Sequence, residues 1–310
     1  MQSAVGPNAT SLPRNEVTAE STQPVAVTIL LPAFNEEAAL TPVVEEIRRV
    51  LSAQPISYEI LVVDDASTDA TATRATSLGV RLVRRAQQGG SGASRKTGVK
   101  AARGEIIVML DADGTYDAAD IPKLLEHFPA WDQVNGDRAT EEGYWKVLRV
   151  PAKWMIRQLA CLLAGRYIPD LNTGLKAFKR EPMMRYLWVV PDGFSCVTSM
   201  TLAFMTNGHP VRWVRVNYRP RIGESKFRPV RDGTRYLVTV VRMITYFRPL
   251  RVFGPLALAL LLGSGAKAWH DLEVVNSGLQ ESTIIMSVGA LLVLILGLLA
   301  DLIVAQKRLP

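Results

Sequence analysis

Cysteine and histidine are scarce in this chain of 310 residues. The two cysteines, Cys161 and Cys196, are far apart in the sequence, and neither has a second cysteine or histidine at a metal-ligand spacing. This excludes a zinc finger and a disulfide framework, and it is typical of a reduced, cytosolic protein. His127 and His209 have no second histidine at a catalytic spacing, so we assign both a structural role.

A signal peptide is missing as well. The first 24 residues lack a basic start and an apolar core, and they are rich in Ser, Thr, Pro, Asn and Glu. We therefore interpret residues 1–24 as a disordered tail. Because no export signal precedes the folded part, we expect that part to stay on the cytosolic side of a membrane.

The average composition fits neither a soluble domain nor a polytopic membrane protein, since 48% of the residues are hydrophobic and the net charge is +7. The apolar excess is concentrated in two uncharged runs, residues 252–266 and 282–300. Each run, with its flanks, approaches the roughly 20 residues that cross a hydrocarbon layer about 30 Å thick. We predict two transmembrane helices within residues 252–306. Two buried helices of a soluble core are the alternative, which the length and leucine content of the second run disfavour.

Charges flank these two spans unevenly. The connection between them carries three acidic residues, Asp271, Glu273 and Glu281. The outer ends carry four basic residues, Arg248, Arg251, Lys307 and Arg308. The positive-inside rule therefore predicts a multi-pass protein of the cytoplasmic membrane, with the domain that precedes the spans and both termini in the cytosol.

Most of the surplus positive charge lies in residues 223–251, just before the first span. This segment has seven Lys or Arg residues and only two acidic residues, Glu224 and Asp232. Polar residues recur at helical spacing between Arg235 and Phe247. A basic amphipathic helix beside a membrane span is expected to lie in the interface and attract anionic head groups. The adjoining spans favour membrane lipids as the partner of this segment and disfavour nucleic acid.

Apolar runs alternate with helical patterns from Val25 onward, with runs at residues 25–34, 59–65, 80–85 and 105–113. This alternation predicts an α/β fold with a mostly parallel sheet. Ligands of such folds bind beyond the carboxyl ends of the strands. Polar residues gather at those expected ends: Asn35, Glu36, Glu37, Asp64, Asp65, Asp111 and Asp113.

The segment Asp111-Ala112-Asp113 carries the strongest chemical signal. Residues i and i+2 of an extended strand project to the same face, so the two carboxylates could share one divalent cation and present it to a diphosphate. Mg²⁺ is usually bound by one or two carboxylates together with phosphate oxygens. A pair of exposed acids at a strand end is the alternative, and the position after an apolar strand favours the metal site.

Six motifs in order extend this picture. They are LLPAFNEE (30–37), LVVDDASTDAT (61–71), IIVMLDADGTYD (106–117), VNGDR (134–138), DLNTGLKAFKR (170–180) and GESKF (223–227). Together they resemble the family 2 glycosyltransferases of GT-A fold, and within them the polyprenyl-phosphate glycosyltransferases, such as dolichyl-phosphate mannose synthases and undecaprenyl-phosphate sugar synthases. The resemblance implies a GT-A domain over residues 25–222, a juxtamembrane segment over 223–251 and the two spans within 252–306.

The resemblance also implies site residues on the donor side. Those expected to border the nucleotide are Pro32, Ala33, Asn35 and Glu37, and Asp64 or Asp65 is expected to contact its base or ribose. Asp111 and Asp113 match the metal-binding DxD motif, with Mg²⁺ or Mn²⁺ as cofactor. Gly114-Thr115 stands where many relatives have Leu-Gln. Residues 89–92 lack the spacing of a phosphate-binding loop, and we predict a flexible loop over the donor.

On the acceptor side, Arg138 matches an arginine that handles phosphate, and Arg149 or Lys153 is expected to be a second basic contact. Asp170 falls near the expected reacting centre, where it could position the acceptor or the sugar or serve as a weak base. Ser225 and Lys226 are expected in a basic loop facing the membrane. Each has a plainer alternative. Arg138 and Arg149 could be solvated surface arginines, and Lys226 could only add lipid-facing charge. Asp170 could cap its own turn.

The function that the resemblance implies is inverting transfer of one sugar from a nucleotide-diphospho-sugar to a polyprenyl phosphate. GDP-mannose, a UDP-hexose or a UDP-N-acetylhexosamine as donor, and dolichyl or undecaprenyl phosphate as acceptor, all stay open, as does assembly into a homo-oligomer. A polysaccharide synthase is the first alternative, but its QxxRW motif is absent. A non-catalytic membrane-tethered binding protein is the second, which the intact DxD disfavours.

Overall fold

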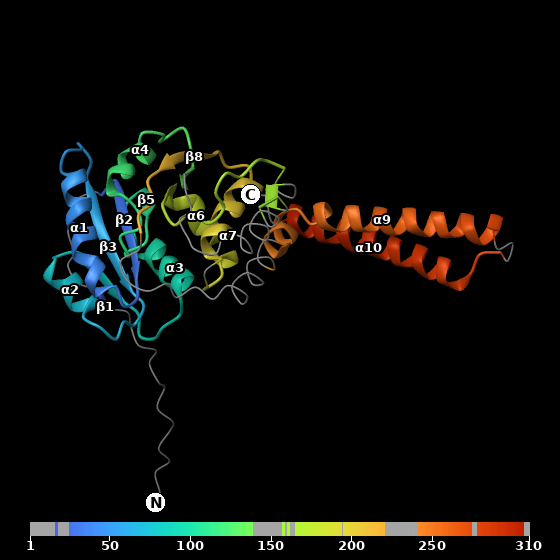
Figure 1. Cartoon of the computed structure of the whole chain (residues 1–310), viewed down its shortest axis with the longest axis horizontal. Coiled ribbons are helices and arrows are strands. Elements are labelled where there is room, and N and C mark those ends of the chain that lie inside the picture. Colours follow the sequence, from blue (N-terminus) through green and yellow to red (C-terminus); the bar gives the residue numbers. More distant parts are fainter. Residues whose placement is uncertain are drawn as a thin grey trace, which may run out of the picture.

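The computed structural model describes residues 16–17, 25–138, 157–158, 160–161, 165–193, 195–220, 238, 241–274 and 278–306. In this part of the chain a helix-covered sheet forms one body, and two long helices project from it as a hairpin (Figure 1). Four residues expected on the acceptor side lie outside the described residues: Arg149, Lys153, Ser225 and Lys226.

The sheet has eight strands in the order β1, β4, β3, β2, β5, β7, β6, β8. Their bounds are β1 Glu16–Val17, β2 Val27–Ala33, β3 Tyr58–Asp64, β4 Arg81–Arg84, β5 Ile106–Met109, β6 Gln133–Arg138, β7 Lys176–Lys179 and β8 Val211–Val216. Parallel pairing joins β4, β3, β2 and β5, and also β6 and β8. Strand β7 is antiparallel to both of its neighbours, and β1 is antiparallel to β4. The predicted mostly parallel α/β sheet is therefore confirmed. Strand β1 lies within residues 1–24, so the interpretation of that stretch as a disordered tail does not hold at Glu16–Val17.

The helices follow the strands in alternation through the first half of the chain. They are α1 Glu37–Leu51, α2 Thr71–Ser77, α3 Ser91–Ala101, α4 Ile121–Leu125, α6 Arg180–Tyr186 and α7 Cys196–Thr206, with short 3-10 turns η1 Ala118–Asp120 and η2 Leu187–Val189. The hairpin consists of α9 Leu250–Trp269, continued by the π-helical turn η3 His270–Val274, and α10 Glu281–Gln306.

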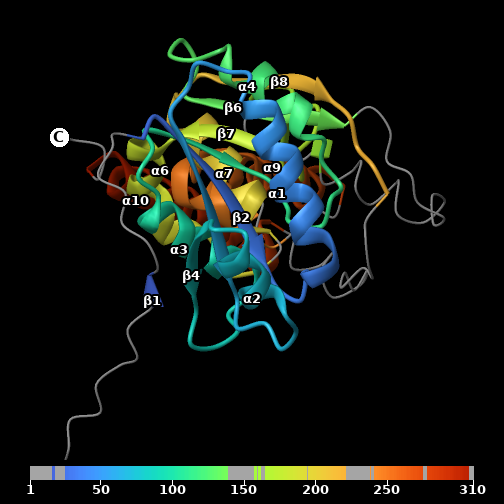
Figure 2. The same ribbon diagram turned by 90° about the vertical axis from the view of Figure 1, so that its left-hand side faces the viewer.

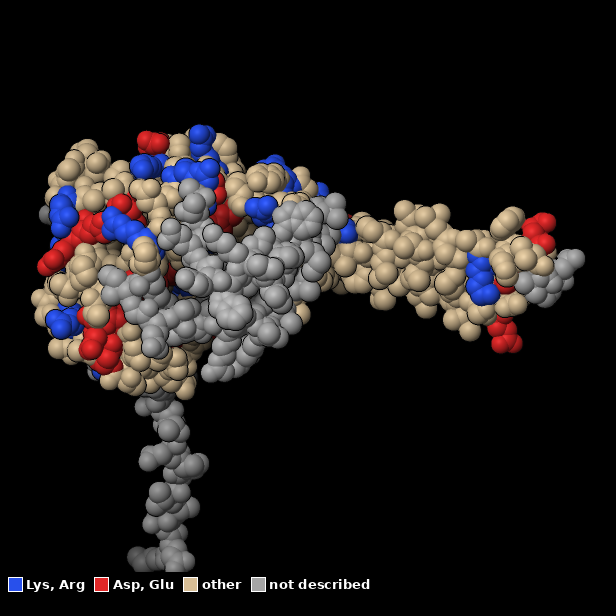
Figure 3. All heavy atoms as spheres, in the orientation of Figure 1, with Lys and Arg blue, Asp and Glu red and all other residues tan. Residues whose placement is uncertain are grey.

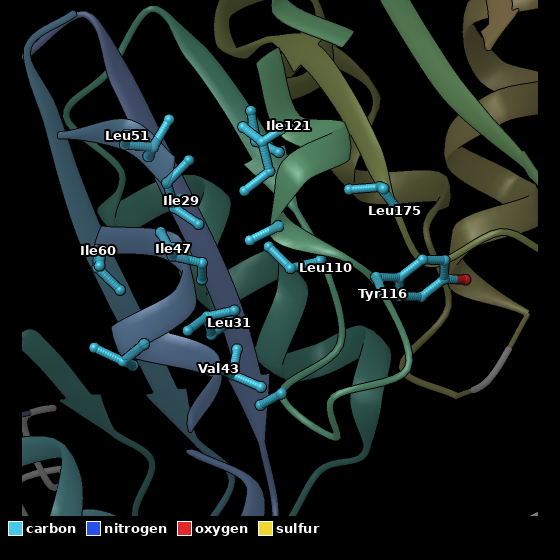
Figure 4. Close-up of a cluster of buried hydrophobic side chains, with 14 of the residues drawn as sticks. Ile29, Leu31, Val43, Ile47, Leu51, Ile60, Leu110, Tyr116, Ile121 and Leu175 are labelled. Atoms are coloured by element: carbon cyan, nitrogen blue, oxygen red, sulfur yellow. The ribbon is translucent and has the colours of Figure 1, made fainter. Parts of the chain in front are cut away.

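Strand β2 separates two hydrophobic clusters because its side chains alternate between the faces of the sheet. Ile29 and Leu31 pack with the buried stripe of α1, in the cluster drawn in Figure 4, whereas Leu30 packs on the other face with Val99 of α3. Figure 2 shows α1 and α3 on opposite sides of β2. The apolar positions of α1 recur every three or four residues, which is why this helix is predictable from sequence.

The strand order reverses at β2. The chain proceeds from β2 outward through β3 to β4, and then returns to place β5 on the other side of β2. Crossover connections therefore diverge at the carboxyl ends of β2 and β5, which leaves room there for a ligand. The segments 34–37 and 110–117 begin at this switch point.

Two local predictions at this edge are wrong. Strand β5 ends at Met109, so Asp111 and Asp113 do not lie on an extended strand; Asp113 lies in a turn and its Oδ1 accepts hydrogen bonds from Thr115 N (3.1 Å) and Oγ1 (2.7 Å). Ser91 and Gly92 belong to the first turn of α3 and not to a loop. Gly92 is buried so closely against Pro191 that a Cβ would collide with its carbonyl oxygen.

The hairpin projects from the domain with an apolar surface. Its shaft is almost free of charged atoms, which gather at the tip (Figure 3). Both helices are long and apolar enough to cross a membrane, and only 11% of the most apolar window of each is buried. They are therefore not core helices of a soluble domain, and they indicate that the chain associates with a membrane. At the tip, Asp271 accepts hydrogen bonds from Lys267 Nζ (3.1 Å) and Thr283 Oγ1 (2.5 Å), which joins the two helices.

Candidate active site

The loops after β2 and β3 are bound to each other by the polar residues of their motifs. Asn35 adopts a positive φ of 54°, its N–H donates to Ser67 Oγ (3.0 Å), and its side-chain Oδ1 accepts from Thr68 N (2.9 Å). Glu37 Oε2 accepts from Ala70 N (2.8 Å). These contacts give Asn35 and Glu37 a structural function at the rim of the switch point, next to the ends of β2 and β3.

The two acids at the end of β3 differ in what they hold. Asp64 is fully buried, accepts from Ser67 N (3.1 Å) and pairs with Arg84 of β4 (3.3 Å), so it shapes its own turn and contacts the neighbouring strand. Asp65 forms an ion pair with Arg85 (2.5 Å) and accepts from the N–H groups of Gly89 (3.1 Å) and Gly90 (2.7 Å). Asp65 therefore ties the segment between β4 and α3 to the switch point.

Behind the DxD segment lies a buried arginine that the sequence reasoning missed. Arg95 of α3 donates from Nη2 to Asp111 Oδ1 (2.5 Å) and from Nη1 to the Sγ of Cys196 (3.4 Å). Its side chain is 7% exposed, whereas that of Asp111 is 33% exposed. The guanidinium thus fixes the carboxylate from the interior and leaves part of it accessible. A clue in the sequence is that Arg95 stands among small residues of α3, a face that packs closely.

The DxD segment meets the loop 170–174 directly. A side chain at Gly174 would collide with the Asp111 carboxylate, and Gly174 N donates to the hydroxyl of Tyr116 (2.6 Å). Tyr116 is in turn paired with Tyr218, with ring centroids 5.3 Å apart at 71°. Two motifs nearly 60 residues apart in the chain are therefore part of one site.

Arg138 and Asp170 form a bidentate ion pair at the edge of this site. The Nε to Oδ2 distance is 2.6 Å and the Nη2 to Oδ1 distance is 3.0 Å, with side chains 10% and 13% exposed. Arg138 lies over the ring of Tyr218, 5.1 Å from its centroid, so it is not a solvated surface arginine. Asp170 also accepts from Asn172 N (2.9 Å), so it both caps its turn and holds Arg138.

The electrostatics of Tyr218 link the two parts of the site. Burial raises the pKa of its hydroxyl, nearby Arg138 lowers it, and the charges of Asp113 and Asp111 raise it. Burial also raises the pKa of Tyr116. Both hydroxyls therefore remain neutral near pH 7 and offer hydrogen bonds without adding charge.

A second buried cation lies beneath the site, and sequence reasoning missed it too. Lys176 of β7 is fully buried and donates from Nζ to Val197 O (2.9 Å) and Thr201 Oγ1 (2.9 Å). Burial lowers the pKa of its amine to about 7, with Cys196 and the acids Asp170 and Asp111 opposing that effect. The residues on either side of Lys176 in the sequence do not indicate that this lysine is buried.

The donor set around Asp111 and Asp113 fits a hard divalent cation. Both side chains offer carboxylate oxygens, which Mg²⁺ and Mn²⁺ prefer. Among the described residues no group of three or more His, Cys, Asp or Glu side chains could hold a metal. Water and phosphate oxygens commonly complete the coordination of Mg²⁺ bound beside a substrate phosphate.

Residues 28–186 match the family described as Glycosyl transferase family 2, and the chain belongs to this family. Over 296 residues, 92% of this chain and 96% of the relative, it is 29% identical to glycosyltransferase AglJ of Haloferax volcanii. It is also 29% identical to the dolichyl-phosphate hexose transferase of that organism, over 69% of this chain and 92% of the relative.

Solved structures agree with the fold. Glucosyl-3-phosphoglycerate synthase from Mycobacterium tuberculosis, in complex with Mn²⁺, UDP-glucose and phosphoglyceric acid, superposes with a TM-score of 0.57. The sequence identity is 20%, and the match covers 71% of this chain and 80% of that chain. At this identity the likeness concerns the fold, which is GT-A-like.

Proposed function

We propose that this chain transfers a single sugar from a nucleotide-diphospho-sugar to a polyprenyl phosphate at a membrane, with inversion at the anomeric carbon. One observation carries the proposal: the Asp111 carboxylate lies against the loop that begins at Asp170 and holds Arg138. A pair of acids suited to a metal diphosphate and a nearly buried cation suited to a phosphate therefore adjoin. The hairpin and a relative named dolichyl-phosphate hexose transferase support a lipid acceptor.

On the donor side, Asp111 and Asp113 would hold Mg²⁺ or Mn²⁺, and the synthase of similar fold was solved with each of these ions. When bound, such an ion neutralises charge on the departing diphosphate without a proton transfer. The residues that would border the nucleotide are Pro32, Ala33, Asn35, Glu37, Asp64 and Asp65. Since Asn35, Glu37 and Asp65 hold loops together, their part is to keep the rim of the nucleotide site rigid.

On the acceptor side, Arg138 would align the lipid phosphate, together with Arg149, Ser225 and Lys226. A phosphate monoester is already anionic near neutral pH, so it needs alignment more than deprotonation. Asp170 would serve as a positioning group, because both of its oxygens are engaged by Arg138 and one also by Asn172 N. A single in-line displacement by the phosphate oxygen then inverts the sugar carbon.

The proposed division of the chain follows from these roles. Residues 25–222 form the transferase domain, 223–251 a basic juxtamembrane segment, and 252–306 two transmembrane helices. The domain and both termini would face the cytosol, where nucleotide sugars are made. Arg248 and Arg251 at the domain end of α9, against Glu273 and Glu281 at the tip, support this orientation.

The experiment is a donor panel with the purified full chain, Mg²⁺ or Mn²⁺, and a short polyprenyl phosphate. Mass spectrometry of the lipid product is expected to show one hexose, uronate or N-acetylhexosamine per phosphate, with one nucleoside diphosphate released for each. A series of products with several sugars would point to a polysaccharide synthase. Absence of lipid product with every donor would overturn the proposal. Glu181→Gln, an exposed residue paired with Arg185 far from the site, is the matched control and should keep full activity.

A further inference from the structure

Three large aromatic side chains are exposed on the domain next to the hairpin. The exposed fractions are 68% for Tyr167, 62% for Trp188 and 43% for Tyr246. Each directly precedes a residue that points inward, and the three inward residues, Ile168, Val189 and Phe247, belong to one buried cluster. A surface that faces water usually carries polar side chains at such outward positions. We name Tyr167, Trp188 and Tyr246 the aromatic patch.

The aromatic patch lies beside the base of α9. Trp188 packs on Tyr246 with ring centroids 5.9 Å apart, and on Phe247 at 6.4 Å. Val252 of α9 packs against the same buried cluster. The loop before Tyr167 also reaches the hairpin, since a side chain at Gly165 would lie 2.6 Å from the Arg251 guanidinium. The patch is therefore continuous with the first turns of a helix whose own leucines are exposed, such as Leu256 and Leu258.

The side-chain chemistry selects a lipid interface as the occupant of this patch. Trp and Tyr combine a large apolar ring with one polar atom, and they concentrate where hydrocarbon meets head groups. Val238 and Val241, from the segment that leads to Tyr246, add exposed apolar area. Arg166 and Arg242 beside them are exposed cations, which attract anionic head groups.

We propose that the aromatic patch docks the transferase domain onto the bilayer surface from which α9 starts. The domain is then held at a fixed height and orientation, and not merely tethered by the hairpin. This inference rests on the proposed membrane span. Tyr246 belongs to the basic segment, whereas Tyr167 and Trp188 belong to the globular domain, and these two add a contact that neither the spans nor the basic segment supplies.

The test measures quenching of single tryptophans by brominated lipids. Of the six tryptophans, all but one are replaced by Phe in the full chain, so that Trp188, Trp131 or Trp269 remains. Each variant is reconstituted into vesicles of phosphatidylcholine and phosphatidylglycerol, with or without dibromo acyl chains. Trp131 packs against the other side of the domain near Arg212 and is the negative control, whereas Trp269 ends α9 and reports on the span.

The proposal expects brominated lipid to quench Trp188 several-fold more than Trp131, and to quench Trp269 as well. If only Trp269 is quenched, the span stands and the docking proposal is wrong. If Trp188 resists both brominated lipid and aqueous acrylamide, a second copy of the chain covers the patch, which also overturns it. If neither Trp188 nor Trp269 is quenched, the span fails and the docking proposal fails with it.

A subtractive measurement covers variants that do not fold. In the otherwise unchanged chain, Trp188→Phe should remove a large share of the lipid-quenchable emission, and Trp131→Phe should leave that share unchanged. Equal effects of the two substitutions would contradict docking through Trp188.

Discussion

The two halves of the candidate site are built with opposite charges. On the half that we propose for the donor, the carboxylates of Asp111 and Asp65 are each held by an arginine, Arg95 and Arg85, at 2.5 Å. On the acceptor half, the order is inverted, and the Arg138 guanidinium is held by the carboxylate of Asp170 at 2.6 Å. A charge taken out of water is costly unless it is paired and hydrogen-bonded. Asp111, Asp65 and Arg138 therefore each have an oppositely charged partner that fixes the position of the side chain.

The largest effect is expected from removing a charge on the donor half. Asp113→Asn keeps the shape of the side chain but removes the negative charge that a metal ion needs. Loss of several kcal/mol of charge stabilisation corresponds to a fall of about 10³-fold or more in kcat/KM. Rates measured over a series of Mg²⁺ and Mn²⁺ concentrations check this, and activity that is insensitive both to this change and to a chelator would remove the metal from the account.

Removing the positive charge on the proposed acceptor half should impair the use of the acceptor and not of the donor. Arg138→Ala leaves Asp170 without its partner, and kcat/KM for polyprenyl phosphate is expected to fall by about 10²-fold. Arg138→Lys keeps the charge but loses the bidentate geometry, so its kcat/KM should lie between those of the native chain and of Arg138→Ala. Kinetics with varied acceptor provide the measurement, with the exposed Arg185→Ala as control. An equal rise in the KM for the donor sugar would argue against two separate halves.

Changing the partner behind a carboxylate should act more weakly than changing the carboxylate. Arg95→Met replaces the aliphatic stem of the buried side chain but removes the guanidinium that fixes Asp111. By analogy with residues that orient metal ligands, apparent metal affinity is expected to fall by about 10- to 100-fold. Excess Mg²⁺ should restore much of the rate, which a general folding defect would not allow. A rate that is reduced equally at all metal concentrations would count against this positioning role.

The smallest effect concerns stability and pH, through Lys176 beneath the site. Burial lowers the pKa of its amine to about 7, so between pH 7 and its ordinary value of 10.5 the folded chain holds it neutral while the unfolded chain holds it charged. Unfolding then takes up a proton, and stability rises with pH by at most about 1.4 kcal/mol per unit in this window.

Lys176→Met should lack this slope. Urea unfolding of the full chain in detergent, followed by tryptophan fluorescence between pH 7 and 9, measures the free energy of unfolding for both forms. Parallel curves for the two chains would mean that Lys176 does not lose its proton on folding.

The sequence predicted those parts of the molecule in which neighbours in the chain share one environment. The buried stripe of α1 and the apolar runs of β2 and β3 are regular patterns, and the hairpin contains two long uncharged runs. Each of these elements can therefore be predicted from its own stretch of sequence. The six motifs also placed the acids at the carboxyl ends of β2, β3 and β5. Their roles stay predictions, as do those of Arg149, Ser225 and Lys226.

What the sequence could not predict depends on contacts between distant segments. The small residues around Arg95 indicate a closely packed face of α3, but not its partners, because these come from α7 and from the segment after β5: Cys196 and Asp111. The pairing of Tyr116 with Tyr218 spans about a hundred residues and leaves no periodic trace. The extended geometry expected for Asp111 to Asp113 was wrong because Thr115 satisfies the Asp113 carboxylate within a turn.

The most direct test of the two-halved site is calorimetric binding of nucleoside diphosphates, with and without Mg²⁺, to the full chain and to Asp113→Asn and Arg138→Ala. We predict that the native chain binds its nucleotide more tightly with Mg²⁺, that Asp113→Asn loses this metal-dependent gain, and that Arg138→Ala keeps it. The same gain in Asp113→Asn, or its loss in Arg138→Ala alone, would contradict the assignment of acids to the donor and of the arginine to the acceptor.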